Sequence, residues 1–166
     1  MSLQLPPFNP FPILSSDSLH LRNITLNDIE QLLPITTYDA VKAKDLADVE
    51  KMLTKIELDY QMGNSISWGI ALKEDDKIIG TCGYYRGFEN YTGEIGFILR
   101  DEYRRKGYMS IAVSLVARFG LKTMGLKHII AITTQNNKPT IQLLEKLNFI
   151  KQKLDSEKRL VFEYQA

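Results

Sequence analysis

The chain has 166 residues, 44% of them hydrophobic, and its 21 basic and 20 acidic residues leave a formal net charge of +1. This length fits one domain with a substantial core, and the near-neutral balance gives no reason to expect a nucleic-acid-binding surface. The single cysteine, Cys82, excludes an internal disulfide framework. No apolar run approaches the roughly 20 residues that cross a bilayer, and no signal peptide is recognisable. We therefore expect a cytoplasmic protein without a membrane partner.

The N-terminal segment is predicted to be an extended arm that precedes a single domain. Residues 1–12 contain prolines at positions 6, 7, 10 and 12, and proline disfavours helices and sheet interiors. We therefore assign residues 1–12 to the arm and residues 13–166 to the domain. The arm could pack on a partner, and both a monomer and a homodimer remain open.

Two helices are expected after a first strand. Residues 19–23 alternate apolar and polar side chains, which predicts a strand. Thr25 offers an N-cap to a helix that should end near Pro34. A second helical stretch is expected from about Tyr38 to Met62, with a break near residue 44 or 45.

The middle of the chain has the pattern of three strands. Ile66–Leu72 and Ile78–Tyr85 flank an acidic turn, so we predict an antiparallel hairpin. Residues 87–92 are expected to form a loop, and Glu94–Leu99 is the next predicted strand.

The last third of the chain predicts two helices and three strands. The apolar face of Tyr108–Met124 indicates a long amphipathic helix, and Ile129–Thr133 has the composition of a buried strand. A short helix over Lys138–Leu147 and a hairpin of Phe149–Leu154 and Arg159–Tyr164 complete the chain. The element order predicts an α/β fold, with a mixed central sheet of about seven strands flanked by helices.

A candidate phosphate site lies between the strand that ends at Leu99 and the long helix. The first turn of a helix has backbone N–H groups without internal partners and a positive dipole end, which together bind a pyrophosphate. Gly107 lacks a Cβ and lets phosphates approach the main chain, while Arg104, Arg105 and Lys106 add positive charge. A basic triplet alone is more often an ordinary solvated turn.

Three segments resemble a known family. Arg104–Met109 resembles the Q/R-x-x-G-x-G/A coenzyme A loop of the GNAT superfamily of N-acetyltransferases. Asn137–Phe149 is similar to its second signature, N-x-x-S-x-x-x-x-E-K-x-G-F. Phe11–Arg22 is similar to the opening of the ribosomal-protein N-terminal (alanine/serine) acetyltransferase branch. Three residues depart conservatively from the two signatures: Met109, Thr140 and Asn148.

The resemblance implies a single GNAT-type domain that uses acetyl-coenzyme A. In this fold the pantetheine arm lies between two splayed parallel strands, here strands 4 and 5 of the expected sheet, Glu94–Leu99 and Ile129–Thr133. Asn137 either faces the pantetheine or only caps the helix that follows it. The cofactor-binding residues implied by the resemblance are Phe97, Ile98, Leu99, Arg104, Arg105, Lys106, Gly107, Tyr108, Met109, Ser110, Asn137 and Thr140.

Glu94 is the candidate catalytic base. It shares a strand face with Gly96, which should leave room beside the carboxylate for an amine or a relaying water. Partial burial would raise the pKa of Glu94 towards the working range, and its position resembles that of the base in histone-acetylating GNAT enzymes. The alternative is an ordinary strand-edge glutamate in water. Leu144 stands where many family members have a tyrosine acid, so we expect no acid there.

The expected activity is transfer of acetyl to a primary amine, in first place the N-terminal α-amine of a protein or peptide. An α-amine, with a pKa of about 7.7–8.0, loses its proton more easily than a lysine amine near 10.4. The alternatives are a small amine (a polyamine, an amino acid or an aminoglycoside) and a non-catalytic acyl-coenzyme A sensor. Carboxylates for an aminoglycoside would come from Glu89, Glu94, Asp101 and Glu102.

The remaining reactive side chains are expected to be structural. Cys82 lies on a strand without a basic neighbour, which is typical of a core residue. His20 and His128 lie in or beside strands. Because His, Cys and carboxylate side chains do not cluster at ligand spacing, no metal is expected.

Overall fold

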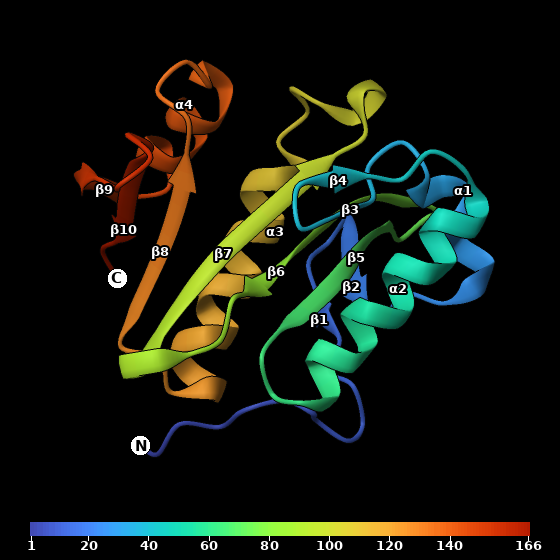
Figure 1. Ribbon diagram of the computed structural model, residues 1–166, viewed down its shortest axis with the longest axis horizontal. Helices are drawn as coiled ribbons and strands as arrows, with labels where there is room; N and C mark the ends of the chain where they lie inside the picture. The colour runs from blue at the N-terminus through green and yellow to red at the C-terminus, as the bar shows by residue number, and fades with distance from the viewer.

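A mixed eight-stranded sheet forms the centre of the molecule (Figure 1). The computed structural model describes residues 1–166. In spatial order the strands are β1 (Leu14–Ser15), β2 (Leu19–Arg22), β5 (Ile66–Leu72), β6 (Ile78–Tyr85), β7 (Thr92–Leu99), β8 (His128–Thr133), β10 (Leu160–Tyr164) and β9 (Phe149–Leu154). The predicted α/β fold with a mixed sheet is confirmed. The extra strand is β1, which is too short to show a periodicity.

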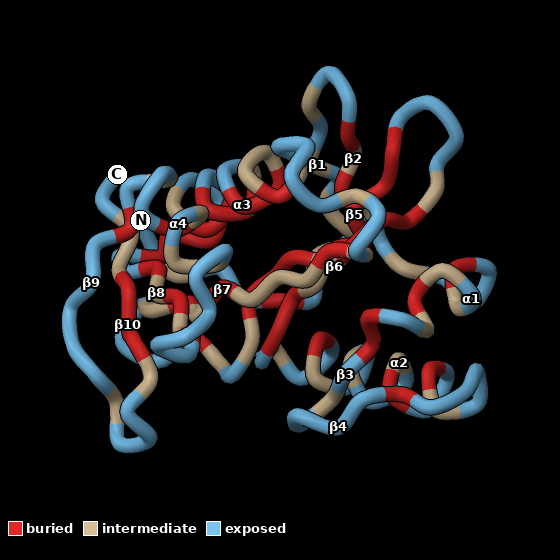
Figure 2. The backbone as a smooth tube through the Cα atoms, turned by 90° about the horizontal axis from the view of Figure 1, so that it is seen from above, coloured by how far each residue is buried: buried red, intermediate tan, exposed pale blue.

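Helices cover both faces of the sheet (Figure 2). One face carries α1 (Ile29–Leu32) and α2 (Leu46–Gln61), and the other carries α3 (Tyr108–Phe119) and α4 (Lys138–Lys146). Because strand side chains alternate between the faces, each face has its own core. The larger core joins α3 and α4 to Trp68 and Tyr84, and the smaller joins α1 and α2 to Ala71 and Ile78. None of the helices is long and apolar enough to cross a membrane.

A short hairpin replaces the first part of the predicted second helix. Strands β3 (Thr37–Tyr38) and β4 (Val41–Lys42) pair with each other, and the two residues between them are both left-handed, Asp39 with φ 49° and Ala40 with φ 62°. Helix α2 starts only after Asp45, whose carboxylate accepts the Asp48 N–H at 2.8 Å. The predicted break near residue 45 is confirmed. The prediction that the helical stretch begins at about Tyr38 was wrong, because the hairpin occupies that segment.

The long helix spans the predicted residues, Tyr108–Met124, but its last turn is not α-helical. It is α-helical to Phe119 and continues as one π-helical turn over Gly120–Met124. The Tyr84 hydroxyl donates to the Val116 carbonyl at 2.9 Å, and a side chain at Gly120 would clash with that hydroxyl. Tyr84 of the sheet therefore contacts α3 at the point where the α-helix changes to a π-helix. Because this contact joins residues far apart in the sequence, the local hydrophobic period cannot predict it.

A buried ion pair joins β2 to the segment before α1. Arg22 donates two hydrogen bonds of 2.9 Å to the Asp28 carboxylate, and Asp28 also accepts the Thr25 N–H at 2.8 Å. Burial alone would raise the pKa of Asp28, but the bonds from Arg22 and Thr25 outweigh it and hold the pKa below its usual value. The predicted helix start at Thr25 is confirmed, first as a 3₁₀ turn over Leu26–Asp28 and then as α1.

The N-terminal arm packs on the domain. Residues 1–12 contain no helix or strand, and the Phe8 N–H donates to the Tyr60 hydroxyl at 2.8 Å. The Trp68 indole N–H donates to the Pro12 carbonyl at 2.8 Å, and the Trp68 ring meets the Phe119 ring edge-on with centroids 5.2 Å apart. The arm thereby contacts Tyr60 of α2 and Trp68 of the larger core, and its Phe8 ring meets the Phe119 ring of α3.

Strands β7 and β8 pair over only three positions and then separate, as Figure 1 shows. They are parallel, and the last pair is Glu94 with Ile130. Beyond Glu94, β7 is bonded to β6 alone. The predicted splay is thereby confirmed.

Candidate active site

The open edge of β7 presents backbone N–H groups to the space between the splayed strands. In an antiparallel ladder, residues alternately direct their N–H and C=O groups at the neighbouring strand or away from it. The Arg100 N–H donates to the Ile79 carbonyl at 2.8 Å, so Ile98 also bonds to β6, whereas Phe97 and Leu99 point away from it. Three residues of β7 were predicted to bind the cofactor. Phe97 and Leu99 have N–H groups that are free for a ligand, whereas the N–H of Ile98 is directed at β6.

The turn before α3 holds unpaired amide groups. Gly107 is left-handed with φ +83°, and a Cβ built on it would meet no atom within 4 Å. The Ile111 N–H donates to the Gly107 carbonyl at 3.3 Å and closes the first turn. The N–H groups of Tyr108, Met109 and Ser110 donate to no acceptor in the protein. Because they lie at the positive end of the helix dipole, this geometry suits a diphosphate.

Three cations lie in the same turn and differ in their freedom. Arg104 forms an ion pair with Asp101 at 3.1 Å, and the Lys106 ammonium lies 5.6 Å from the centroid of the Tyr103 ring. Arg105 is exposed, has a left-handed φ of 62° and forms no ion pair. Arg105 is therefore the cation most free to reach a phosphate.

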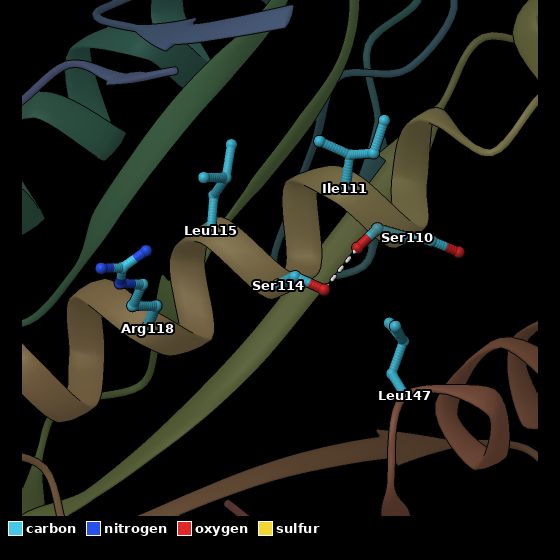
Figure 3. A pocket seen from close by; sticks show the side chains of 6 residues that line it. All are labelled: Ser110, Ile111, Ser114, Leu115, Arg118 and Leu147. Carbon is cyan, nitrogen blue, oxygen red and sulfur yellow. Dashed lines mark hydrogen bonds between the residues drawn. The ribbon is translucent and has the colours of Figure 1, made fainter. Parts of the chain in front are cut away.

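A groove of about 400 Å³ runs along α3 beside the end of α4 (Figure 3). Ser110 and Ser114 line one side, with the Ser114 hydroxyl donating to the Ser110 carbonyl at 2.8 Å. Leu147 faces them from the end of α4. The Met109 side chain points into the core, so Met109 can offer a ligand only its main chain. Because the groove includes Ser110, it is continuous with the unpaired amides.

Asn137 caps α4, which is one of the two roles expected for it, the other being contact with the pantetheine. Its Oδ1 accepts the Thr140 N–H at 3.4 Å, and a proline occupies the first turn, where no N–H is needed. The Thr140 hydroxyl has no hydrogen-bond partner in the protein and is only partly buried. The cap is confirmed, and contact of either residue with a cofactor stays a prediction.

Glu94 lies where the sheet splits. Its side chain is 23% exposed, and the Arg86 Nε lies 3.6 Å from its Oε1. Burial raises the pKa of the Glu94 carboxyl above its usual value, and the charge of Arg86 partly opposes that shift. Glu94 is therefore not an ordinary solvated glutamate. A half-buried carboxylate with a raised pKa beside an open strand edge is suited to accept a proton from an amine.

The space beside Gly96 is filled, contrary to our expectation. A Cβ built on Gly96 would lie 3.0 Å from two ring carbons of Tyr85, so this glycine accommodates a tyrosine ring. The Tyr85 hydroxyl lies 3.0 Å from Ser67 Oγ, and burial raises the pKa of Tyr85 to about 12. The prediction of open space was wrong because a single strand does not reveal which side chain of its neighbour leans across it.

Leu144 and Cys82 are fully buried. The larger core encloses Leu144, so this position supplies no acid. Burial raises the pKa of the Cys82 thiol far above its usual value, which confirms Cys82 as a core residue. His20 pairs with Asp76 and His128 with Glu163, and no three His, Cys, Asp or Glu side chains gather around a common point.

Arg86 was missed by the sequence reasoning. It directly follows the predicted strand Ile78–Tyr85, and no neighbouring residue in the sequence indicates that it lies near Glu94. Its proximity to Glu94 depends on a backbone turn at the end of β6, where Arg86 has φ 66° and the next residue, Gly87, has φ 79°.

Comparisons with known proteins agree with this arrangement. A profile of the Acetyltransferase (GNAT) domain matches residues 18–150. The chain is 31% identical over 150 residues to the uncharacterized N-acetyltransferase YoaA of Bacillus subtilis, covering 86% of this chain and 85% of that protein. A ribosomal-protein alanine acetyltransferase from Vibrio fischeri superposes with a TM-score of 0.73 at 19% identity, covering 92% of this chain and 95% of the other. The spermidine N-acetyltransferase of Vibrio cholerae gives a TM-score of 0.71 at 15% identity, covering 89% and 92%.

Proposed function

The chain belongs to the GNAT acetyltransferase family and is an N-acetyltransferase, and we propose that its acceptor is the N-terminal α-amine of a protein or peptide. The observation that carries the proposal is the position of one carboxylate, Glu94, at the point where β7 and β8 separate. From Glu94, the open edge of β7 leads directly to the unpaired amides at the start of α3.

These residues fit acetyl-coenzyme A, the acetyl donor of GNAT acetyltransferases. The fit rests on the free space at Gly107 and on the amides of the α3 turn that have no acceptor in the protein. Those amides would hold the diphosphate, and Arg105 would add charge. Further contacts with the cofactor are assigned to Arg104, Lys106, Asn137 and Thr140, and no contact is assigned to Ile98, whose N–H is directed at β6.

The edge of β7 would orient the acetyl donor. The N–H groups of Phe97 and Leu99 face the gap between the strands, where they can bind the pantetheine arm and the thioester oxygen. When bound, acetyl-coenzyme A supplies an acetyl group activated as a thioester. The protein then has to hold an amine beside it and remove one proton.

Glu94 would accept that proton, directly or through one water. The raised pKa makes its carboxylate a stronger base than an exposed glutamate. Roughly a tenth of an α-amine is already neutral at pH 7, whereas a lysine amine needs about three pKa units more, on the order of 4 kcal/mol. A site with one carboxylate therefore suits an α-amine. Because Leu144 is buried, we assign protonation of the departing thiolate to water.

A polycationic acceptor is the second candidate, and the spermidine N-acetyltransferase shares the fold. Two of the carboxylates expected to serve such an acceptor are engaged elsewhere. Asp101 pairs with Arg104, and Glu102 pairs with Arg100 at 2.6 Å. These arginines offset the negative charge that would attract a polycation, so the charge distribution favours the α-amine.

A thiol-release assay with acetyl-coenzyme A tests the acceptor. Three acceptors are compared: a peptide with a free N-terminus, the same peptide with a blocked N-terminus and a free lysine, and spermidine. We expect release with the first peptide only. Release with spermidine alone would replace the proposal by the second candidate. Binding of the cofactor without release for any amine would indicate a sensor.

A further inference from the structure

Arg86 breaks the alternation of side chains at the end of β6. Tyr84 points into the larger core and Tyr85 onto the opposite face, so a regular strand would turn Arg86 back towards α3. Instead Arg86 has φ 66°, and its guanidinium reaches Glu94. A left-handed backbone costs a residue with a Cβ about 1–2 kcal/mol.

The packing of the Arg86 side chain does not offset this cost. The side chain is 68% exposed, and it forms no hydrogen bond within the protein. Backbone strain of this kind concentrates at functional sites. Other turns of this chain also hold left-handed residues, and the feature specific to Arg86 is that its turn brings an exposed guanidinium to within 3.6 Å of Glu94.

Arg86 is the cation near Glu94 that no other carboxylate holds. Two arginines act on the charge of Glu94, Arg86 and Arg159. Arg159 is held by Asp155 at 2.8 Å and by Glu157 at 3.3 Å. The 3.6 Å contact between Arg86 and Glu94 is longer than a hydrogen bond, so the guanidinium donors of Arg86 have no acceptor in the protein.

We propose that Arg86 forms an anion-binding subsite beside Glu94, which selects acceptors that carry a negative charge close to the reactive amine. The inference rests on the proposed function, because the anion is placed relative to the amine that Glu94 serves. A guanidinium binds a carboxylate through two parallel hydrogen bonds. For a peptide acceptor, the anion is the side chain of an aspartate or glutamate at the first or second position.

The test compares three peptides that differ only at the second position, with aspartate, asparagine or lysine there. In the native protein we expect kcat/KM for the aspartate peptide to exceed that for the asparagine peptide about tenfold, which corresponds to about 1.4 kcal/mol. Arg86→Gln should abolish this ratio, and Arg86→Lys should retain part of it. Lys151→Gln removes a positive charge from an exposed position on β9 and should leave the ratio unchanged.

Two outcomes would overturn the subsite: equal rates for the aspartate and asparagine peptides in the native protein, or a preference that survives Arg86→Gln. The proposed function can fail separately. If peptides do not react but free amino acids react faster than their carboxamides, and Arg86→Gln removes that difference, the anion subsite stands and the peptide acceptor is wrong.

Discussion

Replacing Gly107 by alanine separates the role of the α3 turn in cofactor binding from its role in folding. A Cβ at Gly107 meets no protein atom within 4 Å, so the substitution creates no clash. Its cost to folding is the left-handed backbone at φ +83°, about 1–2 kcal/mol for a residue with a Cβ. For a domain of this length, about 1 kcal/mol lowers Tm by roughly 2–4 °C.

The effect on cofactor affinity should be larger, because the added methyl group would occupy the space proposed for the diphosphate beside the amides. Loss of one hydrogen bond to a charged group costs about 1.5–3 kcal/mol, so we expect coenzyme A to bind about ten- to a hundredfold more weakly. Isothermal titration calorimetry measures the affinity, and a thermal melt of the same sample measures the stability.

Gly87→Ala is the matched control. Gly87 has φ +79° and also no atom within 4 Å of a built Cβ, so the cost to stability should match that of Gly107→Ala. Its affinity for coenzyme A should stay at the native value. If Gly107→Ala binds coenzyme A as tightly as the native protein, or if both variants lose affinity equally, the diphosphate does not bind at this turn.

Three further predictions concern a base, a core position and an ion pair. Glu94→Gln should lower kcat/KM without changing the calorimetric Kd for the cofactor, and unchanged turnover would remove Glu94 as the base. The pKa of Glu94 is raised in the folded state, so the ionised carboxylate destabilises the fold at high pH. Glu94→Gln removes this charge and should also raise Tm at pH 8, and the gain should shrink as the pH falls towards 4, where Glu94 itself becomes protonated. Leu144→Tyr should destabilise the protein by about 1–3 kcal/mol in denaturant unfolding and bring no gain in kcat; a faster enzyme would show that an acid can act from this position. Asp28→Asn removes one of the two carboxylates that pair with Arg22, which keeps Asp76 at 2.8 Å, and should cost about 1.5–3 kcal/mol at pH 7, the value of a hydrogen bond to a charged group. Because the pKa of Asp28 is lowered, this difference should vanish as the pH falls through that pKa, and equal stability at pH 7 would contradict the reasoning.

The sequence predicted the elements that have a clear local period, because burial of one face imposes that period. The strand Ile66–Leu72, the strand Ile78–Tyr85 and the helix that starts at Tyr108 were all placed at their observed starts. The hairpin of β3 and β4 was missed because its turn uses left-handed Asp39 and Ala40, and alanine gives no sign of that conformation in the sequence.

The candidate site was predictable in its main-chain parts and less so in its side chains. Gly107 and the residues after it could be located because a helix start lies at a fixed place relative to the periodic pattern. The filled space at Gly96 and the approach of Arg86 to Glu94 depend instead on how β6 lies beside β7. Such contacts between strands are set by the register of the sheet, which the sequence of one strand does not contain.

Trp68 gives this protein a built-in optical reporter. It is the single tryptophan of the chain and is fully buried, so its fluorescence should peak at short wavelength while the native packing holds. Its indole is bonded to the arm at Pro12 and packed on α3 at Phe119. A red shift in an unlabelled sample will therefore reveal release of the arm or loosening of α3, and one spectrum per variant can show whether a loss of activity is accompanied by a loss of this packing.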